Sequence, residues 1–386
     1  MTLEEITAQL NGSTFWKEFT FSQNQFSPRS GQEAELADNI VWLGQTLFVI
    51  QMKEREQPTG DSEAEGRWFK NKIRGKAVSQ IKDSLRFLAE HESICISNDR
   101  GHRFEISSKD FLQIEKIILY TDAPALPDEC RAMLYHISET AGFIHLFEQA
   151  NYSQVVKTLA VPEEVRRYLG YRRNALNACT DANIKVVEAD LLAAYMSDEV
   201  VPTPTSHRLL DRLFDDSHQT DLSPIMNRLA DHIQHPDSSD DYTRILLEFA
   251  KLPRSAWRAA KERLDLAIAQ ARNGEFKRPY YFAFPPTDCC FMFSPIPSER
   301  PSTGLEGERT RVTGLSNLTA IAKYLLKTSK GVGVLVSKDG DHFHLDWCLI
   351  DQAWEYDPDL DAHLEKSNPF GAVGEKKIDG FYFFDS

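Results

Sequence analysis

The alternation of apolar and polar positions predicts a β-hairpin near the N-terminus. Two apolar runs, residues 38–43 and 46–53, are separated only by Gly44 and Gln45. A two-residue connection with glycine in its first position is typical of a tight hairpin turn. Because side chains alternate along a strand, Gln51 and Lys53 are expected on one face of the second strand.

A long amphipathic helix is predicted after the hairpin. Its expected inner face recurs every three or four positions and consists of Ile73, Ala77, Ile81, Leu85 and Leu88. The segments "SICISN" and "KIILYTD" predict two later strands, and residues 31–37 predict a short helical turn before the hairpin. Residues 1–122 are therefore expected to form a mixed sheet flanked by helices.

The pattern of apolar and polar residues changes in the rest of the chain. A connector (123–175) leads into residues 176–273, which are mostly helical by pattern and broken at "PTPTS" and "HPDSSDD". From residue 274 onward aromatic runs and a hairpin in "GVGVLVSKDGDHFHLDWCLI" predict an α+β region of unassigned role. The expected fold class is α/β (α+β), with domains 1–122, 123–273 and 274–386.

Composition narrows the function classes. The 386 residues carry a net charge of −14, which argues against a generally basic nucleic-acid binder. No apolar run approaches the roughly 20 residues of a membrane span, and the acidic N-terminus does not resemble a secretion signal. Six cysteines without a CxxC pair predict no structural zinc and no disulfide. These features predict a cytoplasmic protein without membrane partners.

One local patch is strongly basic. "RWFKNKIRGKAVSQIKDSLR", residues 67–86, holds seven Lys or Arg and a single acid. The residues expected to contact nucleic acid are Lys70, Lys72, Arg74 and Lys76. Lys72, Lys76 and Gln80 are spaced four apart and would line one stripe of the helix. A solvated surface helix remains the alternative, and Trp68 and Phe69 would either stack on bases or cover the core.

The ends of the hairpin gather groups suited to a divalent cation. Pairing through a tight turn brings Asp38 close to Gln51 and Lys53, and a helical turn would aim Glu35 in a similar direction. Carboxylate and carbonyl oxygens hold a hard cation such as Mg²⁺. An adjacent ammonium would stabilise negative charge that develops on a phosphate.

These residues carry a family resemblance. The order Glu35, Asp38, hairpin, Gln51-x-Lys53 resembles the PD-(D/E)xK nuclease superfamily, the fold of restriction endonucleases and Holliday-junction resolvases, over roughly the first 120 residues. Two departures from that pattern are Ala37 in place of the proline before the aspartate and Gln51 in place of the second acid. The Gln-x-Lys form resembles the Mrr-like branch.

The resemblance implies a metal-dependent DNA nuclease that leaves 5′-phosphates, with a role in bacterial defence against foreign DNA. Asp38, Glu35 and Gln51 would be the metal ligands, Mg²⁺ the ion and Mn²⁺ a substitute, with RNA open as a second substrate. Lys53 would orient the attacking water, and Gln80 would assist from the helix.

Other hypotheses about the function remain open. A neutral Gln51 also fits a catalytically weak nuclease fold used as a nucleic-acid-binding or assembly subunit. A third hypothesis is a scaffold that forms a homo-oligomer or binds a partner protein through residues 176–386. His342, His344 and Asp346 alternate along one strand, and this His-x-His-x-Asp pattern resembles the first ligand motif of metallo-β-lactamase-fold hydrolases. Trp347 stands where that motif has a further histidine and only about forty residues follow, which favours the polar face of a hairpin over a zinc site.

Two further groups of polar residues have simple interpretations. His232 and His235 precede Pro236 and favour a solvated helix end. The arginines at 166, 167, 172 and 173 lie near Glu163 and Glu164, which favours surface pairing over a phosphate clamp.

Overall fold

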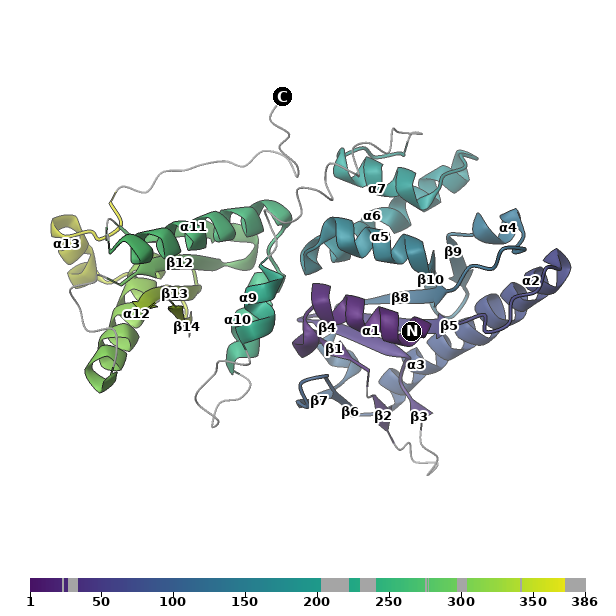
Figure 1. Cartoon of the computed structure of the whole chain (residues 1–386), viewed down its shortest axis with the longest axis horizontal. Helices are drawn as coiled ribbons and strands as arrows, with labels where there is room; N and C mark the ends of the chain where they lie inside the picture. The colour runs from purple at the N-terminus through teal and green to yellow at the C-terminus, as the bar shows by residue number, and fades with distance from the viewer. Residues whose placement is uncertain are drawn as a thin grey trace. The chain divides into compact units, whose positions relative to one another are not determined.

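The computed structural model describes residues 1–22, 24–26, 34–202, 222–229, 241–274, 276, 278–296, 304–340 and 342–371. These residues form two compact units, the first from 1–202 and 223–229 and the second mainly from 241–371. Each unit has its own sheet (Figure 1). His232, His235 and most of the two predicted breaks, "PTPTS" and "HPDSSDD", lie outside the described residues.

The first unit alternates helices and strands. Its elements are α1 (Leu3–Thr14), β1 (Thr20–Phe21), β2 (Gln25–Phe26), β3 (Ala34–Glu35), β4 (Asn39–Leu43), β5 (Thr46–Lys53), α2 (Ser62–Trp68), a π-helical segment (Phe69–Ala77), α3 (Val78–Glu90), β6 (Ile94–Ser97), β7 (Arg103–Ile106), β8 (Gln113–Tyr120), α4 (Asp128–Arg131), β9 (Tyr135–Ser138), β10 (Gly142–Glu148), α5 (Gln149–Leu159), α6 (Pro162–Asp181), α7 (Glu188–Met196) and α9 (Ser223–Leu229). Short 3₁₀ turns cover Lys17–Phe19 and Ser108–Asp110.

A six-stranded mixed sheet organises this unit, with strand order β1-β4-β5-β8-β10-β9. The predicted hairpin is confirmed: β4 and β5 pair antiparallel, and Leu43 faces Thr46 across the turn. Gly44 has φ +57°, the left-handed region that glycine enters without steric cost. β8 then pairs parallel to both β5 and β10. The predicted α/β fold class is confirmed.

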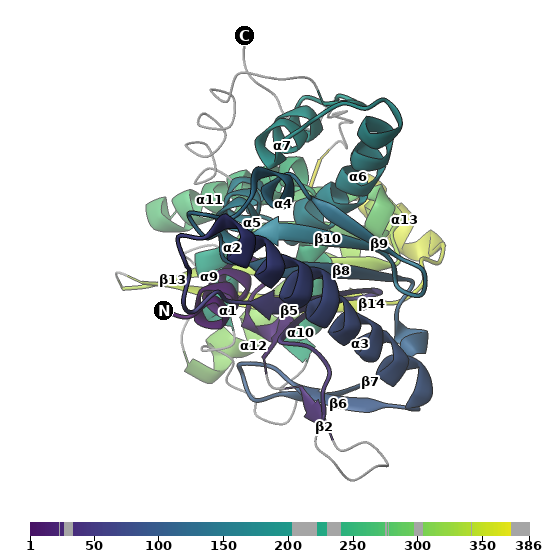
Figure 2. The same ribbon diagram turned by 90° about the vertical axis from the view of Figure 1, so that its right-hand side faces the viewer.

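Helices cover both faces of this sheet. α2, the π-helical segment and α3 run continuously from Ser62 to Glu90 across one face (Figure 2). The predicted inner residues Ile73, Ala77 and Ile81 are fully buried there against Leu47 and Val49 of β5. α1 and α5 cover the opposite face (Figure 1), where Phe15, the C-cap residue of α1, contacts Phe48 of β5 at 5.6 Å between ring centroids.

The sheet continues past the boundary expected at residue 122. β10, part of the segment expected as a connector, pairs parallel with β8, and β9 extends the sheet by one antiparallel strand. The apolar run "FIHLFE" is short for a helix and is buried as a strand in the sheet interior.

The second unit contains a smaller sheet of order β11-β12-β13-β14. Its elements are α10 (Asp241–Ala250), α11 (Arg254–Asn273), β11 (Tyr280–Phe284), a 3₁₀ turn (Pro285–Thr287), β12 (Cys289–Pro295), α12 (Gly304–Leu326), β13 (Lys330–Asp339), β14 (His342–Asp351) and α13 (Pro358–Lys366). The predicted hairpin is present as β13 and β14, and α12 connects the parallel strands β12 and β13. Within 176–273, every described regular element is a helix, as predicted.

Glycine allows α12 to approach β13 closely. A Cβ atom on Gly333 would lie 1.9 Å from the Thr319 hydroxyl and 2.9 Å from Leu315 of α12. Gly331 is also tight, since its Cβ would lie 3.2 Å from Thr319. The glycines of "GVGVLV" therefore allow α12 to pack closely against this buried strand.

Two predictions about the whole chain can be compared with the described residues. All six cysteines are free thiols in the structure. Among the helices that the structure describes, none is long and apolar enough to cross a membrane.

Candidate functional site

Asp38 and Lys53 meet at the open end of the β4–β5 hairpin. Oδ2 of Asp38 accepts a hydrogen bond from the Met52 backbone nitrogen at 2.5 Å and lies 3.5 Å from Nζ of Lys53. Each side chain retains 13% exposure. The hairpin register thus brings a carboxylate and an ammonium together at a point that solvent still reaches.

Gln51 and Gln80 present amide oxygens without hydrogen-bond partners. Gln51 is 3% exposed, and its Oε1 is buried with no partner among the described atoms. Gln80 has a buried Oε1 in the same condition. An unpaired buried carbonyl oxygen loses its hydration without compensation, which is unfavourable unless a water or an ion completes it. Two such oxygens belong to residues that the sequence predicted for one site.

The helix places Gln80 near the hairpin ends. One turn before it, Lys76 is close enough to Lys53 to lower the pKa of that amine. One turn after it, Ser84 donates a hydrogen bond of 2.5 Å to the carbonyl of Leu36, three residues before Asn39 begins β4. Residues four apart share a side of a helix, so Gln80 lies on the same flank as Lys76 and Ser84.

Glu35 reaches the site from a different local structure than predicted. The predicted helical turn is wrong at this residue, because Glu35 lies in β3 and pairs with Gln25 of β2. The pKa of Glu35 is raised, first by partial burial and then by the negative charges of Asp38 and Glu4. Its side chain is nonetheless exposed, so it lies at the rim of the site.

Glu4 of α1 is an acid of this region that the sequence analysis missed. Its charge raises the pKa of Glu35 and favours the protonated form of Lys53. The backbone N–H of its neighbour Leu3 donates to Glu54, just beyond β5, at 3.2 Å. The local sequence here contains only a capping box, formed by Thr2 and Glu5, and this pattern indicates the start of a helix, not a functional site.

Burial lowers the pKa of the Lys53 amine, and the charge of Lys76 acts in the same direction. Asp38 opposes both by charge and by a hydrogen bond. The ammonium of Lys53 also donates to the carbonyl of Met52 at 2.5 Å, which fixes its position beside Asp38.

The predicted nucleic-acid contacts Lys70, Lys72, Arg74 and Lys76 are all exposed. Within the part of the chain that the structure describes, none of them forms an ion pair. The aromatic neighbours serve the core: Phe69 is 1% exposed and packs edge-on to Tyr120, and Trp68 packs against the same cluster.

Metal-binding groups of the usual kind are absent from the described residues, where no three His, Cys, Asp or Glu side chains are placed to hold one ion. The candidate site differs from such a group, because its oxygen ligands would come from two acids and two amides, and amides are not among these four residue types. On β14, Asp346 forms an ion pair of 2.8 Å with Arg311, and His342 and His344 are exposed. These positions match the predicted polar face of the hairpin.

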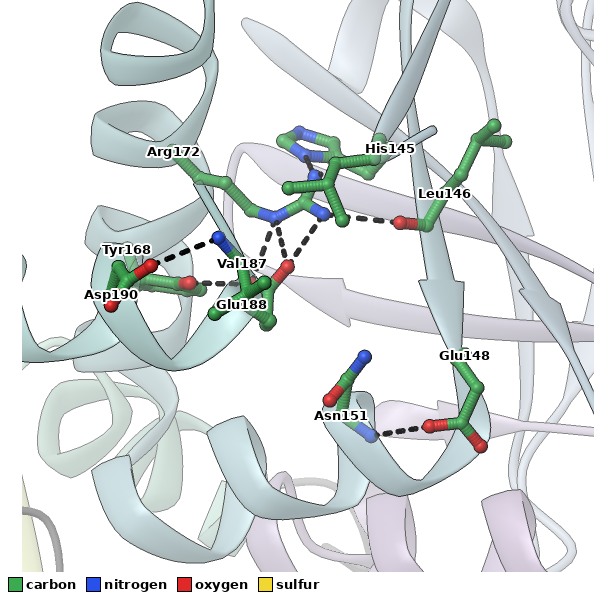
Figure 3. A network of polar contacts seen from close by, with 10 residues as sticks. His145, Leu146, Glu148, Asn151, Tyr168, Arg172, Val187, Glu188 and Asp190 are labelled. Carbon is green, nitrogen blue, oxygen red and sulfur yellow. Dashed lines mark hydrogen bonds and ion pairs between the residues drawn. The ribbon is translucent and has the colours of Figure 1, made fainter. Parts of the chain in front are cut away.

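A buried ionic network joins β10, α6 and α7 (Figure 3). Arg172 of α6 is fully buried, so its predicted surface location is wrong, whereas Arg166 and Arg167 pair with Glu163 at 2.7 Å. Arg172 donates to both carboxylate oxygens of Glu188 at the start of α7, to Oε1 at 2.9 Å and to Oε2 at 2.7 Å. It also donates to the carbonyl of Leu146 at 3.0 Å (Figure 3).

This network includes a histidine whose protonation state follows from its partners. Arg172 donates to Nδ1 of His145 at 3.1 Å, and a guanidinium has no acceptor, so Nδ1 carries no proton. Nε2 therefore donates to Glu115, at 3.2 Å. Burial lowers the pKa of His145 to about 4, consistent with a neutral ring. Both ring nitrogens are engaged, so this histidine has no free nitrogen for acid–base chemistry.

Comparisons with known proteins identify no relative: no family model, no curated protein and no solved structure matches the chain.

Proposed function

We propose that this protein is a metal-dependent nuclease that hydrolyses phosphodiester bonds in DNA. The observation that carries the proposal is the pairing of Asp38 and Lys53 at 3.5 Å. It is supported by the buried, unpartnered amide oxygens of Gln51, two residues before Lys53 on β5, and of Gln80 on α3. Exposed Lys72 and Lys76 lie on the flank of the helix next to them. A cytoplasmic role in defence against foreign DNA belongs to the same proposal.

Mg²⁺, or Mn²⁺ in its place, fits these donors because both prefer oxygen ligands. Asp38, Gln51 and Glu35 would hold the ion, which supplies polarisation of the phosphate and a more acidic bound water. Lys53 stabilises negative charge that develops on the phosphate and is positioned by Asp38 and the Met52 carbonyl. Gln80 assists this site from the helix through its side-chain amide.

The test is cleavage of plasmid and single-stranded DNA with Mg²⁺ or Mn²⁺. We expect Asp38→Ala and Lys53→Ala each to lower the rate by about 100-fold or more, as loss of a charge-stabilising group does. Lys157→Ala on α5 is the matched control, since Lys157 is exposed on the opposite face of the sheet and should cleave like the parent. Equal activity in all four proteins would reject the site.

The neutral Gln51 favours a second candidate, a nuclease fold that binds nucleic acid or assembles with a partner without efficient cleavage. An amide contributes no charge to hold the cation, so metal affinity falls relative to an acid. If the parent is inactive and Gln51→Glu gains both Mn²⁺ affinity and cleavage, this candidate replaces the first. Homo-oligomers or partner contacts through residues 176–386 belong to it.

A further inference from the structure

The helix that follows the hairpin is basic on both flanks. Its inner side is defined by Ile73 and Ala77, which are fully buried. In this π-helical segment residues four apart still lie on the same side, since Phe69, Ile73 and Ala77 are all buried. One flank therefore carries Lys72 and Lys76, together with Gln80, and the other carries Lys70, Arg74 and Lys82.

The charges of the two flanks act on residues of different strands. Lys76 lowers the pKa of Lys53 at the end of β5. Arg74 and Lys82 instead act on His136 of β9 and, after burial, lower the pKa of its ring. Figure 2 shows the helix across the sheet with β9 and α4 on one side of it.

Strand register independently puts His136 beside the second flank. It pairs with Ile144 of β10, whose side chain is buried in the same core as the helix. Paired residues project to the same face of a sheet, so His136 projects toward the helix at the edge of the sheet. Arg74 and Lys82 thus form a basic pair on the side away from Lys53, with the imidazole of His136 next to them.

Between the two flanks the outer surface of the helix carries short side chains. Asn71, Gly75 and Ser79 are all exposed there. Nothing in the fold requires glycine at position 75: its φ is not positive, and a Cβ would only reach ordinary contact, 3.5 Å from the Lys70 carbonyl. Glycine is unfavourable inside a helix, so its presence at this exposed position leaves room for a close approach from outside.

We propose that this helix docks in a groove of duplex nucleic acid and sets its two basic flanks on the phosphates of the two strands. A helix with side chains is about 10–12 Å across, and the major groove of B-DNA is about 12 Å wide. The strand on the Lys72–Lys76 flank reaches Asp38 and Lys53, and the opposite strand lies on Arg74, Lys82 and His136. This assignment of the cleaved strand rests on the proposed nuclease function; the docking does not.

The test measures binding without cleavage, by fluorescence anisotropy of a short labelled duplex and of its single strand in EDTA, at about 50–200 mM salt. We expect the parent to prefer the duplex. The double variant Arg74→Gln/Lys82→Gln should bind the duplex about tenfold more weakly, with the salt slope reduced by about 2, one unit for each lost phosphate contact. Lys157→Gln, on the opposite face, is the matched control and should leave both unchanged.

A second pair of variants tests the groove itself. Gly75→Leu adds a bulky side chain to the outer surface and should abolish the duplex preference, whereas Gly75→Ala should keep it and support the helix. Circular dichroism verifies that the variants are folded. Equal binding of duplex and single strand by the parent, or no effect of either the flank variants or Gly75→Leu, overturns the proposal.

These outcomes separate docking from catalysis. A parent that binds the duplex through both flanks but cleaves nothing with Mg²⁺ or Mn²⁺ rejects the nuclease and retains the docking. A parent that cleaves DNA while Arg74→Gln/Lys82→Gln binds and cleaves unchanged rejects the docking and retains the nuclease.

Discussion

Replacing Arg172 by methionine tests the buried network directly. The side chain is fully buried and binds Glu188, which is 3% exposed. It also donates to the carbonyl oxygens of Leu134 and Leu146, at 3.1 and 3.0 Å, and packs its guanidinium over Phe147. Methionine retains much of the volume but supplies no donor.

The expected cost is set by the carboxylate left behind. After Arg172→Met, Glu188 keeps the Tyr168 hydroxyl as a donor, at 2.5 Å, but has no cation inside the core. Breaking a buried ion pair from one side typically costs about 3–5 kcal/mol. For a unit of this size that corresponds to a fall in Tm of roughly 6–20 °C.

Differential scanning calorimetry measures the change, with Arg67→Met as the matched control. Arg67 pairs with Glu63 on the surface of the same unit, with the two side chains 59% and 83% exposed, and its loss should cost only about 0.3–0.5 kcal/mol. The double variant Arg172→Met/Glu188→Met should be more stable than the sum of its single variants, because no unpaired charge remains. A cost under about 1 kcal/mol for Arg172→Met would refute the reasoning, since exposed pairs give that value.

Three further predictions concern other parts of the chain. Gly333→Val should destabilise the second unit by about 1–3 kcal/mol or more through overpacking against Thr319, lowering its calorimetric transition; an unchanged transition contradicts the close packing of α12. His145 has a folded pKa of about 4 against 6.5 in the unfolded chain, so the unfolded state binds more protons between these values and the stability of the first unit should fall as the pH drops from 6.5 to 4. Urea titrations at several pH values check this, and His145→Gln should flatten the profile over that range. Glu65, which binds Arg55 at 2.8 Å and Thr59, has its pKa lowered to about 2, so its contribution is present above pH 4.5 and is lost as the pH falls from 4.5 toward 2. The acid unfolding curve of Glu65→Gln should therefore be shallower below pH 4.5; an identical curve argues against the buried pair.

The sequence alone determined the elements whose signals are local. The Gly44 turn, the flanking apolar runs and the helix through Ile73, Ala77 and Ile81 depend on backbone preference and on the spacing of apolar residues. These signals also placed Gln51 and Lys53 on one face and predicted the α/β class. The candidate site was readable because the hairpin that builds it closes within a few residues.

Only the tertiary structure decided which distant residues share an environment. Glu35 is a strand residue because it pairs with Gln25, and Arg172 is buried because Glu188 and the end of β10 surround it. Nor does spacing along the chain indicate that Glu4 of α1 lies near Glu35. Pairing across a sheet and the burial of a charge depend on partners far apart in sequence, and a local pattern carries no information about them.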